Sequence, residues 1–219
     1  MFHINQANNL IGTHPHLIFW ISLITESQKI TDIDTKKTVF DFGCADGKFL
    51  QVFDLMDNLE FGIGVDIDID LIQSAKLIPN PKLYFANKIN FEDRFDLAFS
   101  QEVLYTLPDL KKHAEDIFSV LKPNSYYFAT MGCHIDNPLW SLRRDIIKER
   151  ENFPVFDYSL DEVAKEFSSV GFKVGLKRLP NIYFAMYDEI ETKLFSKDYL
   201  SLVNNISDHK MVFMFYKPC

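Results

Sequence analysis

The residues with the clearest chemical character lie in a short segment that follows an apolar run. The segment reads Asp41-Phe42-Gly43-Cys44-Ala45-Asp46-Gly47, and Thr38-Val39-Phe40 before it has the pattern of a buried strand. Small residues let a ligand approach the backbone closely. A helix that starts directly after such a turn presents free N–H groups and the positive end of its dipole, which favour an anionic group.

A second carboxylate follows at the end of the next apolar segment. Asp66 lies 19 residues after Gly47, where the second strand of the pattern ends. Ligands of open α/β sheets bind outside the carboxyl ends of the strands, and a carboxylate at this place can accept hydrogen bonds from both ribose hydroxyls. The turn and Asp66 together predict a nucleoside ligand.

The spacing of the small residues indicates which nucleoside is bound. A dinucleotide loop reads G-x-G-x-x-G, and its third glycine permits close packing of helix and strand. The three positions here hold Gly43, Ala45 and Lys48, and Gly47 falls one residue early. The pyrophosphate loop is therefore poorly matched, although a nicotinamide-dependent reductase stays an alternative. The sequence also contains no GxxxxGK[ST] phosphate-binding loop.

These segments resemble the class I S-adenosylmethionine-dependent methyltransferases. The first motif of that family is similar to [DE]-x-G-x-G-x-G, which Asp41, Gly43, Ala45 and Gly47 follow with one Gly→Ala departure. Further segments resemble the family in the same order: Val65-Asp66-Ile67, Asn87-Lys88-Ile89, residues 95–104, and Val120-Leu121-Lys122-Pro123-Asn124. The resemblance covers residues 37–132 by motifs and the two ends only by topology.

The resemblance implies methyl transfer with S-adenosylmethionine as cofactor. Asp41 would favour the cofactor's ammonium, the turn would hold its methionine part, Asp66 would bind the ribose, and Ile67 would cover the adenine. The implied cofactor-binding residues are Asp41, Gly43, Cys44, Ala45, Gly47, Asp66, Ile67, Asn87, Lys88, Ile89 and Ser100. Cys44 is expected to fill space rather than act as a nucleophile. A binding module that keeps the cofactor without catalysis is a second alternative.

The candidates for catalysis follow the fourth and fifth predicted strands. His134 comes after the fifth strand and can accept a proton from a hydroxyl or an amine. Tyr105 comes after the fourth strand and is expected to line the acceptor site. His14 and His16 precede a predicted N-terminal helix over residues 17–24. The alternative for any single histidine is a surface or capping role.

The acceptor is predicted to be a small metabolite or sugar, methylated on oxygen or nitrogen. Enzymes that methylate amino groups of nucleic acids resemble [DNS]-P-P-[YFW] after the fourth strand, where this chain has Ser100-Gln101-Glu102-Val103. The net charge of −8 also argues against nucleic-acid binding. A basic group after the fifth strand is either a solvated helix face or a grip for an anionic acceptor: Arg143, Arg144, Lys148 and Arg150.

The elements that position these residues alternate between strand and helix. We predict strands over 38–42, 61–66, 82–86, 95–100 and 126–131, and helices over 48–56, 70–77 and 109–121. Such alternation indicates βαβ units in a parallel sheet. Later segments predict a helix over 160–170, strands over 172–179 and 209–217, and mixed helical character over 181–208. The predicted fold is a three-layer, doubly wound α/β fold; the resemblance implies a mostly parallel seven-stranded sheet with an antiparallel last strand.

The whole chain is predicted to form one domain over residues 1–219. Residues 1–36 would form a helical cap, 37–132 the cofactor-binding core and 133–219 the acceptor side. The early apolar run is too short for a membrane span and lacks the basic flank of a signal peptide. Three widely spaced cysteines indicate reduced thiols in a cytoplasmic protein and no metal site. The sequence leaves the oligomeric state open.

Overall fold

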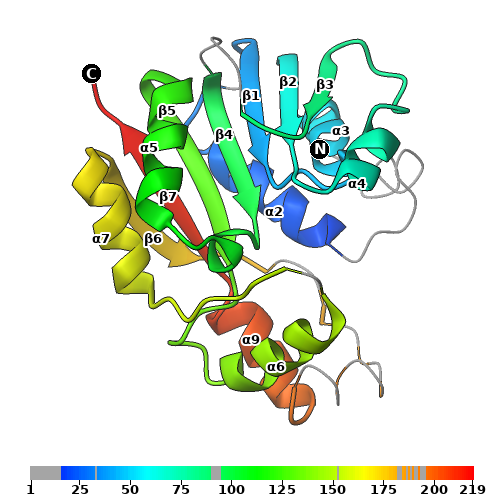
Figure 1. The fold of residues 1–219 in the computed structure, drawn as a ribbon, viewed down its shortest axis with the longest axis vertical. Coiled ribbons are helices and arrows are strands. Elements are labelled where there is room, and N and C mark those ends of the chain that lie inside the picture. The colour runs from blue at the N-terminus through cyan, green and yellow to red at the C-terminus, as the bar shows by residue number, and fades with distance from the viewer. Residues whose placement is uncertain are drawn as a thin grey trace.

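Seven strands form one sheet in the order β3-β2-β1-β4-β5-β7-β6 (Figure 1). The structure, a computed structural model, describes residues 16–32, 34–89, 95–151, 153–181, 184, 185, 187, 189, 192 and 196–219. The strands are β1 (Lys37–Phe42), β2 (Leu59–Val65), β3 (Leu83–Ala86), β4 (Phe95–Gln101), β5 (Leu121–Met131), β6 (Lys173–Arg178) and β7 (Met211–Lys217). All run parallel except β7, which is antiparallel to both of its neighbours. The predicted fold class is confirmed.

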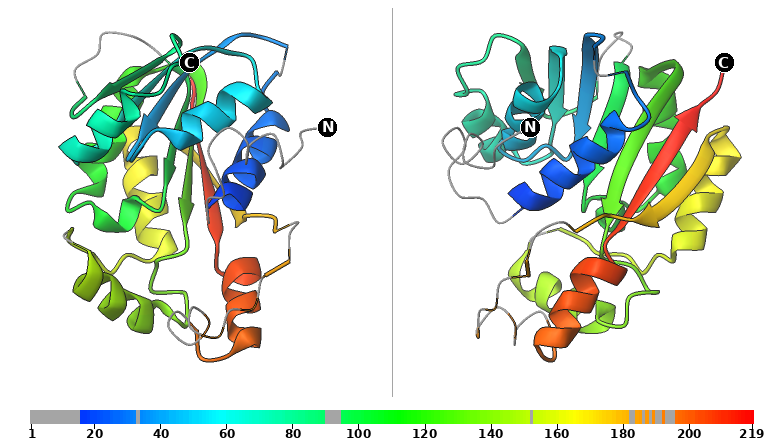
Figure 2. Two further views of the ribbon diagram at one scale, coloured as in Figure 1. Left: turned by 90° about the vertical axis from the view of Figure 1, so that its right-hand side faces the viewer. Right: turned by 180° about the vertical axis from the view of Figure 1, so that it is seen from behind.

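Helices cover both faces of this sheet, as the side view in Figure 2 shows. The described helices are α2 (Leu17–Gln28), α3 (Lys48–Met56), α4 (Ile69–Ala75), the short 3₁₀ helix η1 (Leu104–Thr106), α5 (Leu110–Val120), α6 (Trp140–Arg150), α7 (Leu160–Val170) and α9 (Tyr199–Asp208). Apolar residues of α2, α3 and α4 share one core with the sheet, and those of α5 and α7 share the other. Among the described helices, none combines the length and apolar character that a bilayer crossing requires.

Several elements begin and end where local chemistry dictates. α3 and α7 have the predicted bounds. Ser159 and Glu162 form a reciprocal capping box at the start of α7, and Gly171 ends it in the left-handed conformation with φ 114°. Asp68 caps α4 by accepting hydrogen bonds from two backbone N–H groups.

β5 differs from the prediction at its start. We predicted a helix up to residue 121 and a strand only from residue 126, but the strand begins at Leu121, directly after α5. Leu121 pairs with Phe95 and Tyr126 pairs with Leu97, so the pairing with β4 shifts between these two points. The intervening residues form an irregularity in β5, and Asn124 takes φ 60° there. A bulge within a strand tolerates proline and a left-handed residue, which is why this segment resembled a turn.

α6 and α9 both lie beyond the end of the sheet where β5 stops and β7 starts (Figure 1). Asn137 holds them there, because its Nδ2 donates to the Gly132 carbonyl at 2.7 Å and to Asn205 Oδ1 at 2.8 Å. His134 Nε2 also lies 2.9 Å from the His209 carbonyl. These buried hydrogen bonds join the segment after β5 to the segment before β7.

We expect Lys37→Met to lower the free energy of unfolding by about 3–5 kcal/mol, because it leaves a buried carboxylate without its cation. Lys37 Nζ lies 2.8 Å from Asp57 Oδ1, and the two side chains are 4% and 0% exposed. Urea denaturation measures the change. Lys82→Met is the control, because the Lys82–Asp54 pair is 46% and 18% exposed and its loss should cost at most about 1 kcal/mol. Equal losses in both variants would contradict the prediction.

Candidate functional site

The turn between β1 and α3 has an unusual backbone. Gly43, Ala45 and Gly47 have positive φ angles of 74°, 46° and 77°. A Cβ atom on Gly43 would lie 2.4 Å from Val103 Cγ2, and one on Gly47 would lie 2.5 Å from the Phe85 ring. Both positions therefore require glycine for conformation and for space.

Asp66 is hydrogen-bonded to this turn. Its Oδ2 accepts a hydrogen bond from the Ala45 N–H at 2.9 Å, and its Oδ1 accepts one from the Asp68 N–H at 3.0 Å. The N–H groups of Gly43 and Cys44 donate to the Val65 carbonyl at 2.8 and 3.1 Å. The turn and the end of β2 form one unit, and each carboxylate oxygen of Asp66 keeps capacity for further donors.

Asp41 lies near Asp66, and one of its carboxylate oxygens has no hydrogen-bond partner among the described residues. Its side chain is 1% exposed, and its Oδ2 has no hydrogen-bond partner in the part of the chain that the structure describes. Burial, and secondly the charge of Asp66, raise the pKa of Asp41 well above its usual range. A buried carboxylate oxygen without a partner is costly. A cationic ligand group, such as an ammonium, would satisfy it.

Cys44 lies under the turn and fills space. It is buried, and a Cβ atom on Gly64 would lie 2.8 Å from its Sγ. Burial and the neighbouring carboxylates raise the pKa of the Cys44 thiol, so the thiol stays protonated. This environment agrees with the space-filling role expected from the sequence.

The residues expected around an adenine lie at the ends of β2 and β3. Ile67 is 85% exposed. Asn87 and Lys88 are exposed and Ile89 is half-buried. The structure therefore brings an open apolar surface next to Asp66.

Ser100 is placed differently from the other predicted cofactor residues. Its side chain is buried, and its hydroxyl makes a hydrogen bond with the Tyr127 hydroxyl, which lies 3.1 Å from His113 Nε2. The Ser100 side chain thus takes part in a buried hydrogen-bond chain.

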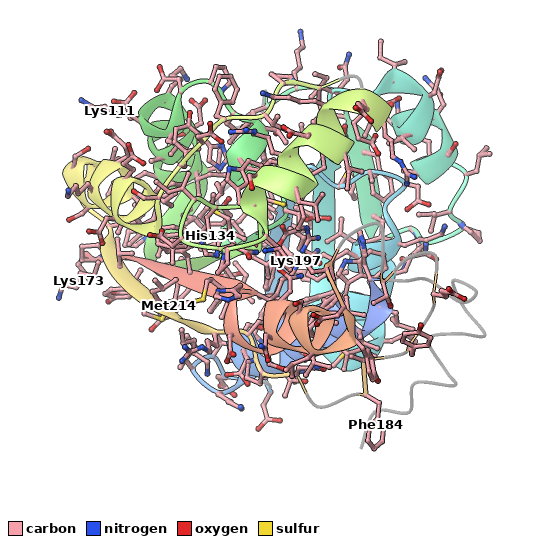
Figure 3. The ribbon with its side chains drawn as sticks, turned by 90° about the horizontal axis from the view of Figure 1, so that it is seen from below. Lys111, His134, Lys173, Phe184, Lys197 and Met214 are labelled. Atoms are coloured by element: carbon pink, nitrogen blue, oxygen red, sulfur yellow. The ribbon has the colours of Figure 1, made fainter. Side chains whose placement is uncertain are left out.

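The two catalytic candidates are both buried beyond the carboxyl ends of β4 and β5. Tyr105 packs edge-on against Trp140 at 5.8 Å between ring centroids, and burial raises the pKa of its hydroxyl. His134 is 1% exposed, and Figure 3 labels its position as seen from below. Because a carbonyl only accepts, His134 donates from Nε2 to His209, and its Nδ1 has no hydrogen-bond partner within the described residues. Asp136 Oδ2 lies 3.8 Å from that Nδ1.

Glu102 is a site residue that the sequence reasoning missed. It has φ 56°, accepts the Gly132 N–H at 3.0 Å with both carboxylate oxygens, and lies 2.5 Å from Lys210 Nζ. Burial would raise the pKa of Glu102, but Lys210 and the Gly132 N–H outweigh it and hold the pKa at about 2. Glu102 follows β4 and Lys210 precedes β7, so only the folded sheet brings them together.

Two hollows in the described part lie away from this site. One, of about 440 Å³, lies at the amino ends of the strands near Lys37 and Lys122. The other, of about 260 Å³, lies between the end of α2 and β6 and β7. Neither is lined by the turn, Asp66 or Glu102.

The chain is similar to several solved structures at low sequence identity. One is a chain from the complex of the Haloferax volcanii Trm112 methyltransferase activator with a candidate methyltransferase: 16% identity, TM-score 0.78, covering 99% of this chain and 95% of that one. Another is an S-adenosylmethionine-dependent methyltransferase from Mesorhizobium loti: 12% identity, TM-score 0.67, covering 90% and 98%. A third is the Haemonchus contortus phosphoethanolamine N-methyltransferase 2: 17% identity, TM-score 0.66, covering 93% and 56%. These likenesses confirm the fold.

The family follows from the sequence comparison. Among curated proteins no relative matches this chain. A sequence model described as a methyltransferase domain matches residues 19–175, which is most of the chain and includes the turn, Asp66, Glu102 and His134. The chain therefore belongs to the methyltransferase domain family, and it is a class I methyltransferase that uses S-adenosylmethionine.

Proposed function

We propose that this enzyme moves a methyl group to an oxygen or nitrogen atom of a small-molecule acceptor, a metabolite or a sugar. The observation that carries the proposal is the position of α6 and α9 beyond the end of the sheet, where Asn137 donates to the Gly132 carbonyl after β5 and to Asn205 in α9. The acidic net charge supports it, since it disfavours a nucleic-acid acceptor. One neighbour, the Haemonchus contortus enzyme, was solved with the small molecule phosphomonomethylethanolamine.

The cofactor contacts follow from the turn and the two carboxylates. When bound, S-adenosylmethionine supplies a methyl group activated by a sulfonium, while the protein supplies position. We assign Asp66 to the ribose hydroxyls, and Asp41, whose Oδ2 is unpaired, to the ammonium. The exposed side chain of Ile67 would cover one face of the adenine, and residues 87–89 would lie at its edge. The buried Ser100 hydroxyl would support this region from inside.

We assign proton acceptance to His134. Burial lowers the pKa of His134 below its usual value, so its ring is neutral at pH 7. With Nε2 engaged by the His209 carbonyl, Nδ1 is the atom left to accept a proton, and Asp136 would stabilise the imidazolium. Tyr105 would support the acceptor site through its packing against Trp140. Of the earlier histidines, His14 lies outside the described residues.

The aromatic segment 181–208 and α2 would close over the acceptor. Several described aromatic side chains of this segment are exposed, and Phe184 projects outward with 91% exposure (Figure 3). Tyr187 and Tyr199 contact each other at 5.4 Å between ring centroids. His16, the N-cap residue of α2, packs edge-on against Trp20. A cytoplasmic location and a single domain over 1–219 stay predictions.

Two alternative functions, a reductase and a non-catalytic binding module, can be distinguished from the proposed methyltransferase by experiment. Membership in the methyltransferase family disfavours the nicotinamide-dependent reductase, and fluorescence titration with NADH would detect one. A module that binds the cofactor without catalysis would bind S-adenosylhomocysteine but give no turnover with any of a panel of hydroxyl and amine acceptors.

Asp66→Ala should weaken binding of S-adenosylhomocysteine at least about tenfold, because a charged acceptor of two hydroxyl hydrogen bonds is lost. Isothermal titration calorimetry measures the affinity. Asp70→Ala, a change at an exposed residue of the adjoining α4, is the matched control and should bind like the wild type. Unchanged affinity in Asp66→Ala would remove the ribose role. A folded wild type that binds nothing at millimolar ligand would defeat the cofactor assignment.

His134→Gln should lower turnover of a hydroxyl acceptor about 10²–10⁴-fold and flatten the acid limb of the pH–rate profile. The sign follows from the base role: in the wild type, activity falls as the pH drops through the pKa of His134, which lies below 6.5. Asn137→Ala is the control, since it loosens the same segment but keeps the base. It should lower the rate and retain the acid limb; a retained limb in His134→Gln would refute the assignment.

A further inference from the structure

No described residue pairs with the guanidinium of Arg143 in α6. The residue is half-buried, its Nε is inaccessible to water, and its side chain makes no hydrogen bond or ion pair within the described residues. Other described arginines differ: Arg144 lies 2.9 Å from Asp157, and Arg178 lies 3.6 Å from Asp208. An arginine stays charged at all physiological pH values and carries five N–H donors. Its Nε is buried without an acceptor, which is costly, and an anionic ligand could supply one.

The side chain of Arg143 belongs to the acceptor end of the site. It follows Trp140 by three residues on α6, so the two share one side of the helix. Trp140 is buried and contacts Tyr105 edge-on. Burial acts to raise the pKa values of Glu102, Tyr105 and Cys133, and the positive charge of Arg143 opposes this effect at all three, although only Glu102 ends with a lowered pKa. Its guanidinium therefore lies near the carboxyl ends of β4 and β5.

The positive and negative charges around Glu102 and Arg143 do not balance. The carboxylate of Glu102 already has Lys210 at 2.5 Å and accepts the Gly132 N–H. Lys210 Nζ also lies over the Phe19 ring, 4.8 Å from the ring centroid. This second contact supports the position of Lys210 beside Glu102. The positive charge of Arg143 is thus in excess of what Glu102 needs.

We propose that Arg143 binds an anionic group of the acceptor, a carboxylate or a phosphate, and so selects acidic acceptors. A guanidinium matches the two oxygens of either group with parallel hydrogen bonds, in a geometry that lysine cannot reproduce. This inference rests on the proposed small-molecule methyltransferase and names the chemical class of its substrate. It also separates Arg143 from Arg144, whose charge is already paired with Asp157.

An NMR titration tests the proposal. The ¹⁵N-labelled protein is saturated with S-adenosylhomocysteine and titrated with sodium phosphate or sodium benzoate at constant ionic strength, while chemical shifts are recorded. The indole N–H of Trp140, which donates to Asp157 at 2.6 Å, reports from the same helix, and the Trp20→Phe variant assigns its signal. We expect saturable shifts with at least one anion and at least tenfold weaker binding in Arg143→Gln. The anion affinity of Arg143→Lys should fall between those of the wild type and Arg143→Gln. The anion affinity of Arg144→Gln should be within twofold of the wild type.

The outcomes separate this inference from the proposed function. Which anion binds more tightly distinguishes a phosphate from a carboxylate acceptor. Wild-type affinity in Arg143→Gln, or an equal loss in Arg144→Gln, overturns the inference, even if S-adenosylhomocysteine binds normally. Failure of the wild type to bind S-adenosylhomocysteine in calorimetry would instead reject the cofactor assignment. In turnover assays, Arg143→Gln should lower kcat/KM at least tenfold for acidic acceptors and leave kcat/KM unchanged for the amides of the same acceptors. Equal losses of kcat/KM for acids and amides would also overturn the inference.

Discussion

The hydrogen bond from the Ala45 N–H to the Asp66 carboxylate holds together the part of the molecule on which the rest of the site depends. It links the turn after β1 to the end of β2, across a backbone in which three alternate residues have positive φ. Glycine adopts such angles freely, but Ala45 is strained by its φ of 46° and keeps it only where its surroundings determine it. Here the Val65 carbonyl, Val103 and Phe85 supply the remaining constraints.

The same arrangement leaves the Asp41 carboxyl without a compensating positive charge among the described residues. Asp41 and Asp66 are near enough for the charge of one to raise the pKa of the other, but only Asp66 is hydrogen-bonded to backbone donors from the turn. Asp41 remains buried with an unpaired oxygen. A cationic ligand group relieves both the repulsion and the missing partner, which is the physical reason why this fold suits a cofactor with an ammonium and a sulfonium.

The acceptor end is organised by different interactions. Glu102 is held by Lys210, His134 by the His209 carbonyl and Asn137 by Asn205, so each link joins the ends of β4 or β5 to the segment before β7. Buried polar groups that are satisfied make such a connection specific. Among the described residues, Asp41 Oδ2 has no hydrogen-bond partner at the cofactor side, and Arg143 Nε has none at the acceptor side. Each end of the site thus keeps one buried polar atom that a bound reactant could satisfy.

The sequence by itself determined the elements and the turn, because these depend on neighbours in the chain. The bounds of α3 and α7 follow from a glycine turn, a capping box and Gly171, and the role of small residues at positions 43–47 is visible from their spacing. Local signals misled at β5, where a bulge opposite β4 resembles a turn. Only the tertiary structure decided the pairing of Glu102 with Lys210 and the isolation of Arg143. Those depend on β7 lying antiparallel beside β5, a long-range pairing that no short window of residues encodes.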